Sequence, residues 1–176
     1  MLAAAPYMIV FRIVHVLAGI FWGGAVYMLV VFVQPSVAAI APAGAPFMAE
    51  LLGKRKLVDA LIGLGSATVV GGLFLYWHDW HLYGSFGTWI STRFGATLTV
   101  GAIAAILALA IGILGTRPNV VRLLAMGRSV AESGGPPSPQ VAAEIAQTQN
   151  RLKVFARISF GLIVLAALAM ALARYI

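Results

Sequence analysis

The chain has 176 residues, of which 61% are hydrophobic and only 10% charged, and its mean hydropathy is +0.97. Soluble domains do not have this composition, so it excludes a soluble globular protein and predicts an integral membrane protein. The formal net charge of +7 does not predict nucleic-acid binding, because the basic clusters have no interleaved aromatic residues. The chain has no cysteine, which excludes disulfides, thiol catalysis and thiolate metal sites.

Four apolar stretches are long enough to cross a membrane as helices. A hydrocarbon layer of roughly 30 Å needs about 20 apolar residues per helix, and the stretches are too long and continuous for the strands of a membrane barrel. The sequence therefore predicts one transmembrane domain covering 1–176, an all-α integral membrane four-helix bundle. Its spans are expected at about 8–35, 57–80, 93–116 and 155–175.

The first predicted helix carries glycines for close packing and one ionisable residue. Gly19 and Gly23 have the spacing that lets two helices in a membrane approach closely, and Pro35 is expected to end the helix. His15 lies nearly one turn from Arg12, so we expect its imidazole in the outer leaflet, facing the bundle. The i, i+3, i+4, i+7 rule puts His15 on one stripe with Met8, Arg12, Gly19 and Trp22.

The second predicted helix begins after the basic run 54–56 and ends in an aromatic belt over 76–83. Asp59 lies in the first turn, where a carboxylate favours the helix dipole, and Lys56 is near enough to pair with it. Two histidines, His78 and His81, lie three residues apart at the end of this helix, so both could point the same way.

The third and fourth predicted helices are extended by a long basic connection, 117–154. Its first half keeps a helical pattern, 134–137 reads Gly-Gly-Pro-Pro, and Ser138 and Pro139 are an N-cap and a first helical residue. We therefore expect an antiparallel cytoplasmic hairpin with its tip at 134–137. It is either a solvated extension or a docking surface for a partner.

The distribution of Lys and Arg predicts the orientation. The two connections 54–56 and 117–157 carry nine of these residues, and only Arg12, Arg93 and Arg174 lie on the opposite side. Both termini and the middle connection are therefore expected outside (N-out/C-out), and the basic rim is expected to contact anionic lipid headgroups in the cytoplasmic leaflet.

The three histidines are the candidate site. A helix of about 22 residues from Leu57 returns the chain to the outer interface at His78, which predicts similar depths for His15 and His78. His15 with either His78 or His81 could ligate a haem iron. A tighter group of these histidines with Asp79 or Met8 would suit a copper or zinc ion. The structural alternative is that His15 only hydrogen-bonds between helices and that the other two belong to the aromatic belt.

The segment 11–24, with His15, Trp22 and Gly24 in a His-x-x-x-x-x-x-Trp-x-Gly pattern, resembles small bacterial four-helix membrane proteins related to the copper-resistance protein D family. It is also similar to membrane domains attached to some bacterial urate oxidases. The resemblance implies a four-helix protein of the bacterial inner membrane, with a role in periplasmic copper handling or haem-linked electron transfer. Only His15 and Trp22 are carried over as cofactor-binding residues, and the chain lacks a Met-rich copper stretch.

Two functions follow as expectations. The first is an outer His site that binds haem b or a metal ion for electron transfer or copper handling. The second is a non-catalytic accessory or assembly subunit, bound to a membrane protein partner or to further copies of itself. The predicted midplane carries almost no charge, which argues against transport by this chain alone, and no motif favours an enzyme.

Overall fold

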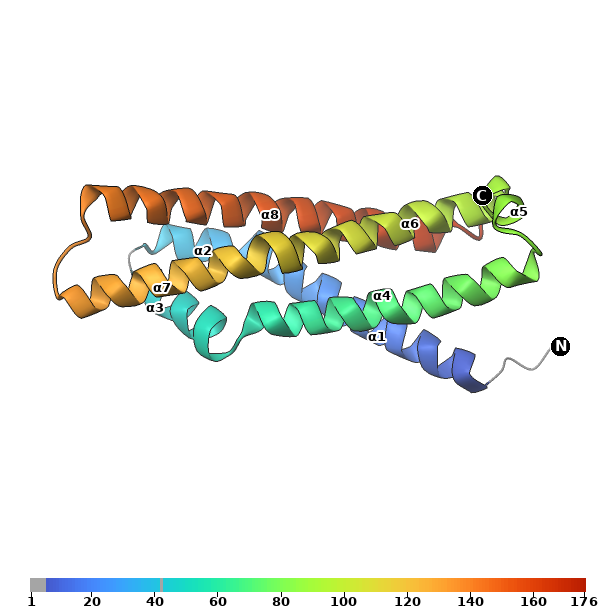
Figure 1. The fold of residues 1–176 in the computed structure, drawn as a ribbon, viewed down its shortest axis with the longest axis horizontal. Helices are drawn as coiled ribbons and strands as arrows, with labels where there is room; N and C mark the ends of the chain where they lie inside the picture. The colour runs from blue at the N-terminus through green and yellow to red at the C-terminus, as the bar shows by residue number, and fades with distance from the viewer. Residues whose placement is uncertain (1–5, 42) are drawn as a thin grey trace.

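The computed structural model describes residues 6–41 and 43–176, and within these ranges the chain forms helices and turns without a strand (Figure 1). Four helical segments are long and apolar enough to cross a membrane: Pro6–Ala39, Leu57–Leu82, Arg93–Ser133 and Pro139–Leu172. This confirms an all-α bundle with four helices of membrane-spanning length, which fits a multi-pass membrane protein.

The first segment consists of α1 (Pro6–Met28), a π-helical turn η1 (Leu29–Val33) and α2 (Gln34–Ala39). It is followed by α3 (Gly44–Ala49), a second π-helical turn η2 (Glu50–Lys54) and α4 (Leu57–Leu82). After the short α5 (Phe86–Ser91) come α6 (Arg93–Ala110), η3 (Ile111–Thr116) and α7 (Arg117–Ser133), and α8 (Pro139–Leu172) completes the chain.

The long helices form an elongated antiparallel bundle in which α1 packs on α4, α4 on α6, α6 on α8, and α8 on α1. The start of α1, α5 and the C-terminus lie at one end, which we call the α5 end (Figure 1). The turns after α2 and α7 lie at the opposite end, which we call the α3 end. Small residues dominate the contacts between α6 and α8, where Ala104, Ala105 and Ala166 form a buried cluster that lets the two backbones approach closely.

Contacts between α1 and α4 fix their register. The pairs in order from the α5 end are Tyr7 with His78, Phe11 with Phe74, His15 with Gly71 and Gly72, Gly19 with Thr68, and Trp22 with Gly65. Steps of three or four residues along α1 are matched by steps of two to four residues back along α4, as expected for antiparallel helices. This register decides the relative depth of every candidate residue on the two helices.

Pro35 does not end the first helix, contrary to the sequence-based expectation. The helix continues through α2 to Ala39 because Pro35 stands in the first turn of α2, directly after the wide turn η1. A proline removes one N–H and clashes with the carbonyl four residues earlier, and a π-helical turn at that place changes the hydrogen-bond register. The expected cap at the start of α8 is confirmed, since the Ser138 hydroxyl accepts from the backbone N–H of Val141 and Pro139 begins the helix.

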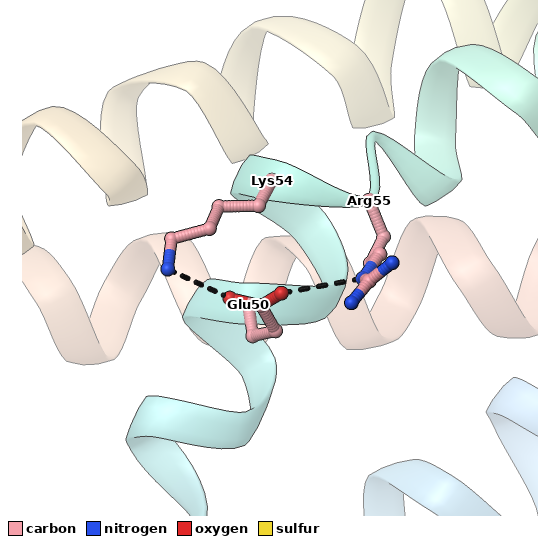
Figure 2. A network of polar contacts seen from close by, with 3 residues as sticks. All are labelled: Glu50, Lys54 and Arg55. Atoms are coloured by element: carbon pink, nitrogen blue, oxygen red, sulfur yellow. Dashed lines mark hydrogen bonds and ion pairs between the residues drawn. The ribbon is translucent and has the colours of Figure 1, made fainter.

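Ion pairs join charged residues of the α3 end. Glu50 lies between Lys54 and Arg55, with nitrogen–oxygen distances of 3.1 and 3.2 Å (Figure 2). Asp59 pairs with Arg117 at 2.7 Å, so the expectation that Lys56 is its partner is wrong. That pair bridges α4 and α7. All of these groups are well exposed, so each pair positions side chains and adds little stability.

Candidate functional site

The imidazole of His15 is fixed by α4 on two sides. Its Nδ1 lies 2.7 Å from the backbone carbonyl oxygen of Thr68, and a methyl group built at Gly72 would lie 2.8 Å from both Cε1 and Nδ1 of the ring. A methyl group built at Gly71 would likewise lie 3.3 Å from the Phe11 carbonyl oxygen, so α1 also packs closely there. The ring therefore occupies the space that a side chain at Gly72 would need.

The hydrogen bond to Thr68 assigns a proton to Nδ1 of His15. A carbonyl oxygen can only accept, so Nδ1 donates, and in the neutral imidazole Nε2 is then the nitrogen that holds the lone pair. A histidine that donates one ring N–H to a backbone carbonyl and offers the other nitrogen is the arrangement found at metal-ligating histidines, because the bond fixes the ring and raises its basicity. His15 thus offers a ring nitrogen that could ligate a metal ion, as the candidate site needs.

Thr68 is the residue that sequence reasoning missed. It is buried, its Oγ1 donates to the carbonyl oxygen of Leu64 at 2.8 Å, and its methyl group faces Gly19. The signal was present in the sequence, since Thr68 precedes Gly71 and Gly72 by three and four residues and so shares their helix face. Only the register of α1 against α4 identifies His15 as the residue opposite.

His78 does not lie at the depth of His15, so that expectation is wrong. His15 faces Gly72, whereas His78 is six residues further along α4, or about 9 Å at a rise of 1.5 Å per residue. The ring of His78 instead meets Tyr7 edge-on, with centroids 6.4 Å apart. In this conformation the two imidazoles are not opposed across a common plane.

His81 is exposed and turned toward its own helix. Its Nδ1 donates to the carbonyl oxygen of Trp77 at 2.8 Å, and its ring lies 4.6 Å from the ring of Trp77 and 5.0 Å from that of Trp80. His78 and His81 therefore face different surroundings although they are three residues apart. This is the behaviour of a belt residue.

The remaining candidates are spread along the bundle. Met8 is buried on α1, two turns from His15, and Asp79 is within electrostatic reach of His78, Arg12 and Arg174. Trp22 lies in the apolar core with Val26 and Ala108. Among residues 6–41 and 43–176, no three His, Cys, Asp or Glu side chains come close enough together to hold a metal ion. His15 is thus the centre of the site, and the other candidates do not gather around it.

The aromatic belt has its own buried anchor, Trp89 of α5, which the sequence did not single out. Its side chain is fully buried, with the rings of Tyr76, Tyr83 and Phe94 around it at centroid distances of 4.9 to 5.6 Å. A methyl group at Gly95 would clash with the Trp89 carbonyl oxygen, so only glycine fits there. This packing holds α5 against the start of α6.

Comparison with known proteins adds no further evidence on the site: no family model, no characterised protein and no solved structure matches the chain.

Proposed function

We propose that the chain is a multi-pass protein of a bacterial inner membrane that binds haem b or a copper ion at an outer-side site centred on His15. The observation that carries the proposal is the hydrogen bond from Nδ1 of His15 to the Thr68 carbonyl oxygen. It fixes the ring and leaves the lone pair of Nε2 for a metal ion or haem iron. The group would serve electron transfer or periplasmic copper handling, as the resemblance to the copper-resistance protein D family implies.

The geometry suits a haem or copper ion with one histidine ligand from this chain. It does not suit the pair of axial histidines that the sequence suggested. His15 supplies a neutral imidazole of the right tautomer, and the offset of about 9 Å along α4 separates it from His78. A bound haem or copper ion would supply one-electron chemistry. In this chain Thr68 orients the imidazole, Gly72 makes room for it, and the packed helices around it limit access of water.

The orientation is part of the proposal. Nine basic residues lie toward the α3 end and three toward the α5 end. By the positive-inside rule, the α5 end is then at the outer face of the membrane and the α7–α8 hairpin is in the cytoplasm. His15 then lies in the outer half of the bilayer. The basic residues of the α3 end then meet anionic headgroups.

An absorption spectrum of the purified protein, made with haem and copper supplied and recorded before and after dithionite, tests this function together with elemental analysis for copper. We expect a Soret band or bound copper in the unmodified protein, and neither in His15→Ala. His81→Ala is the matched control, because His81 is exposed and bonds only to its own helix, so it should keep the bound group. Absence of both haem and copper from the unmodified protein contradicts the proposal.

A second function, that of an accessory or assembly subunit, is favoured by an uncharged segment that extends to the α3 end. The chain carries no Lys, Arg, Asp or Glu over 13–49. From the register of Trp22 with Gly65, the Asp59–Arg117 pair lies level with Met28, and the first helix continues eleven residues beyond that level, or about 16 Å.

Apolar side chains on this extension are open to their surroundings. Ile40 and Phe47 are 58% and 52% exposed, and they line a hollow of about 300 Å³ with Phe32, Val33, Ser36 and Val37. Exposed apolar side chains beyond the level of the Asp59–Arg117 pair are typical of a surface that a partner protein covers. Extraction in mild detergent should then yield a larger complex that Ile40→Lys combined with Phe47→Lys disrupts, whereas a lone monomer in native membranes argues against this function.

A further inference from the structure

A cavity of about 60 Å³ lies between the helices of the bundle, toward the α3 end. All four spanning segments contribute to its wall, and most of the lining is apolar. The lining residues are Trp22, Val26, Leu29, Val58, Leu61, Ile62, Ala108, Leu109, Gly112, Thr116, Ala156 and Ser159. Thr116 and Ser159 are the two lining residues that carry a hydroxyl group.

The hydroxyl of Ser159 has no hydrogen-bond partner within the described part of the chain, although the residue is only 8% exposed. Other buried or half-buried hydroxyls on these helices donate to the carbonyl four residues earlier, as Thr68, Thr99 and Thr148 do. A buried hydroxyl without a partner is costly. Ser159 is therefore a place where a hydrogen-bonding group from outside the described residues would be stabilising.

The wall beside Ser159 is built from the wide turn η3. Gly112 of that turn has no side chain, and a methyl group there would approach Ile62 only to 3.8 Å, so it would extend into free space. Thr116 is the last residue of η3, and the Asp59–Arg117 pair joins the residues next to Val58 and Thr116. An exposed ion pair thus lies at the α3 side of the cavity.

We propose that this cavity binds water, held by the hydroxyls of Ser159 and Thr116 and exchanged past the Asp59–Arg117 pair. A buried water needs some 10–15 Å³ of such volume and two to four polar partners, so the space admits about four molecules. On the opposite side the ring of Trp22, packed on Gly65, closes the cavity toward His15. The site is independent of the proposed function, because it lies in the other half of the bundle.

Radiolytic hydroxyl labelling of the full chain in lipid nanodiscs, read by mass spectrometry, tests this site. Bound water generates radicals in place, so we expect Trp22 to be oxidised well beyond its small exposure, and Ser159→Ala to reduce that labelling severalfold. Ser91→Ala is the matched control: the Ser91 hydroxyl has a partner in Gly87 and lies in α5, so the substitution should leave Trp22 labelling unchanged.

The thermal unfolding midpoint of Ser159→Ala is a second readout. In a dry cavity the substitution would raise the midpoint, because it removes a hydroxyl without a partner. If water is bound, Ser159→Ala lowers the unfolding midpoint because the water loses a ligand. Should the serine variant fail to fold, Gly112→Ala, which places a methyl group in the cavity, is expected to reduce Trp22 labelling instead. A Trp22 that is labelled no more than its exposure predicts, with a higher midpoint for Ser159→Ala, overturns the proposal.

Discussion

Two aromatic rings of α1 lie on glycines of α4 in the same way, and the two places differ in what the ring can do next. Trp22 covers Gly65 and His15 covers Gly72, so both members of the pair shift by seven residues. A seven-residue repeat returns to the same face of packed helices. The indole has its faces in the apolar core, whereas the imidazole bonds to a backbone carbonyl and keeps one nitrogen for another ligand.

A glycine that allows two helices to pack closely can therefore also orient an ionisable group. At Gly65 the missing side chain allows a large apolar surface to be buried. At Gly72 the same absence brings a ring nitrogen within hydrogen-bond distance of the helix carbonyl. The first contact should therefore matter most for stability, and the second for binding.

The largest effect is expected from removing the indole. Trp22→Ala takes a buried ring out of the core cluster and leaves a void against Gly65, which should lower the free energy of unfolding by about 3–5 kcal/mol. Equilibrium unfolding in mixed micelles with increasing SDS measures it. His15→Ala in the same assay should cost clearly less, because its ring is only partly buried. Equal losses would remove the distinction between the two contacts.

Filling the glycine under the indole should have the next largest effect. A methyl group at Gly65 would lie 2.9 Å from Cε2 of Trp22 and 3.1 Å from Cδ1 of Leu109, so it meets packed groups from two helices. Gly65→Ala should destabilise the protein by about 1–3 kcal/mol in the same assay. Gly63→Ala is the control, since a methyl group there has no neighbour within 4 Å. A Gly65→Ala protein as stable as the control would show that Trp22 can move freely.

Filling the glycine under the imidazole should cost less stability and more function. A methyl group at Gly72 meets mainly the movable ring of His15, so displacement of the ring should cost about 0.5–1.5 kcal/mol. The hydrogen bond to Thr68 should be lost, which ¹⁵N NMR of the imidazole detects as loss of the fixed Nδ1–H tautomer. Any haem or copper binding should fall with it. An unchanged tautomer would show that the glycine does not position His15.

Sequence reasoning predicted what depends on local patterns and missed what depends on register. The four helices, the Ser138 cap and the stripe with His15 and Trp22 follow from apolar length and helical spacing. The depth of His15 relative to His78 does not, because it is decided by which glycine of α4 accepts which ring of α1. Pro35 was misread since the wide turn η1 has no sequence signature, and the burial of Trp89 depends on how α5 folds against α6.

The smallest effect is expected from the side-chain hydrogen bond between α4 and α6 near the α5 end, where no aromatic ring packs on a glycine. Thr99 donates its hydroxyl proton to the Gly95 carbonyl at 2.7 Å, so the Tyr76 hydroxyl, 2.6 Å from Thr99 Oγ1, must donate to it. Side-chain hydrogen bonds between membrane helices contribute about 0.6 kcal/mol on average, so Tyr76→Phe should cost no more than that. A double-mutant cycle with Thr99→Val isolates the bond: the tyrosine substitution should lose its effect once Thr99 is gone. If Tyr76→Phe instead costs as much as Gly65→Ala, hydrogen bonding and not ring packing dominates the outer contacts of α4, because Phe keeps the ring that packs on Trp89.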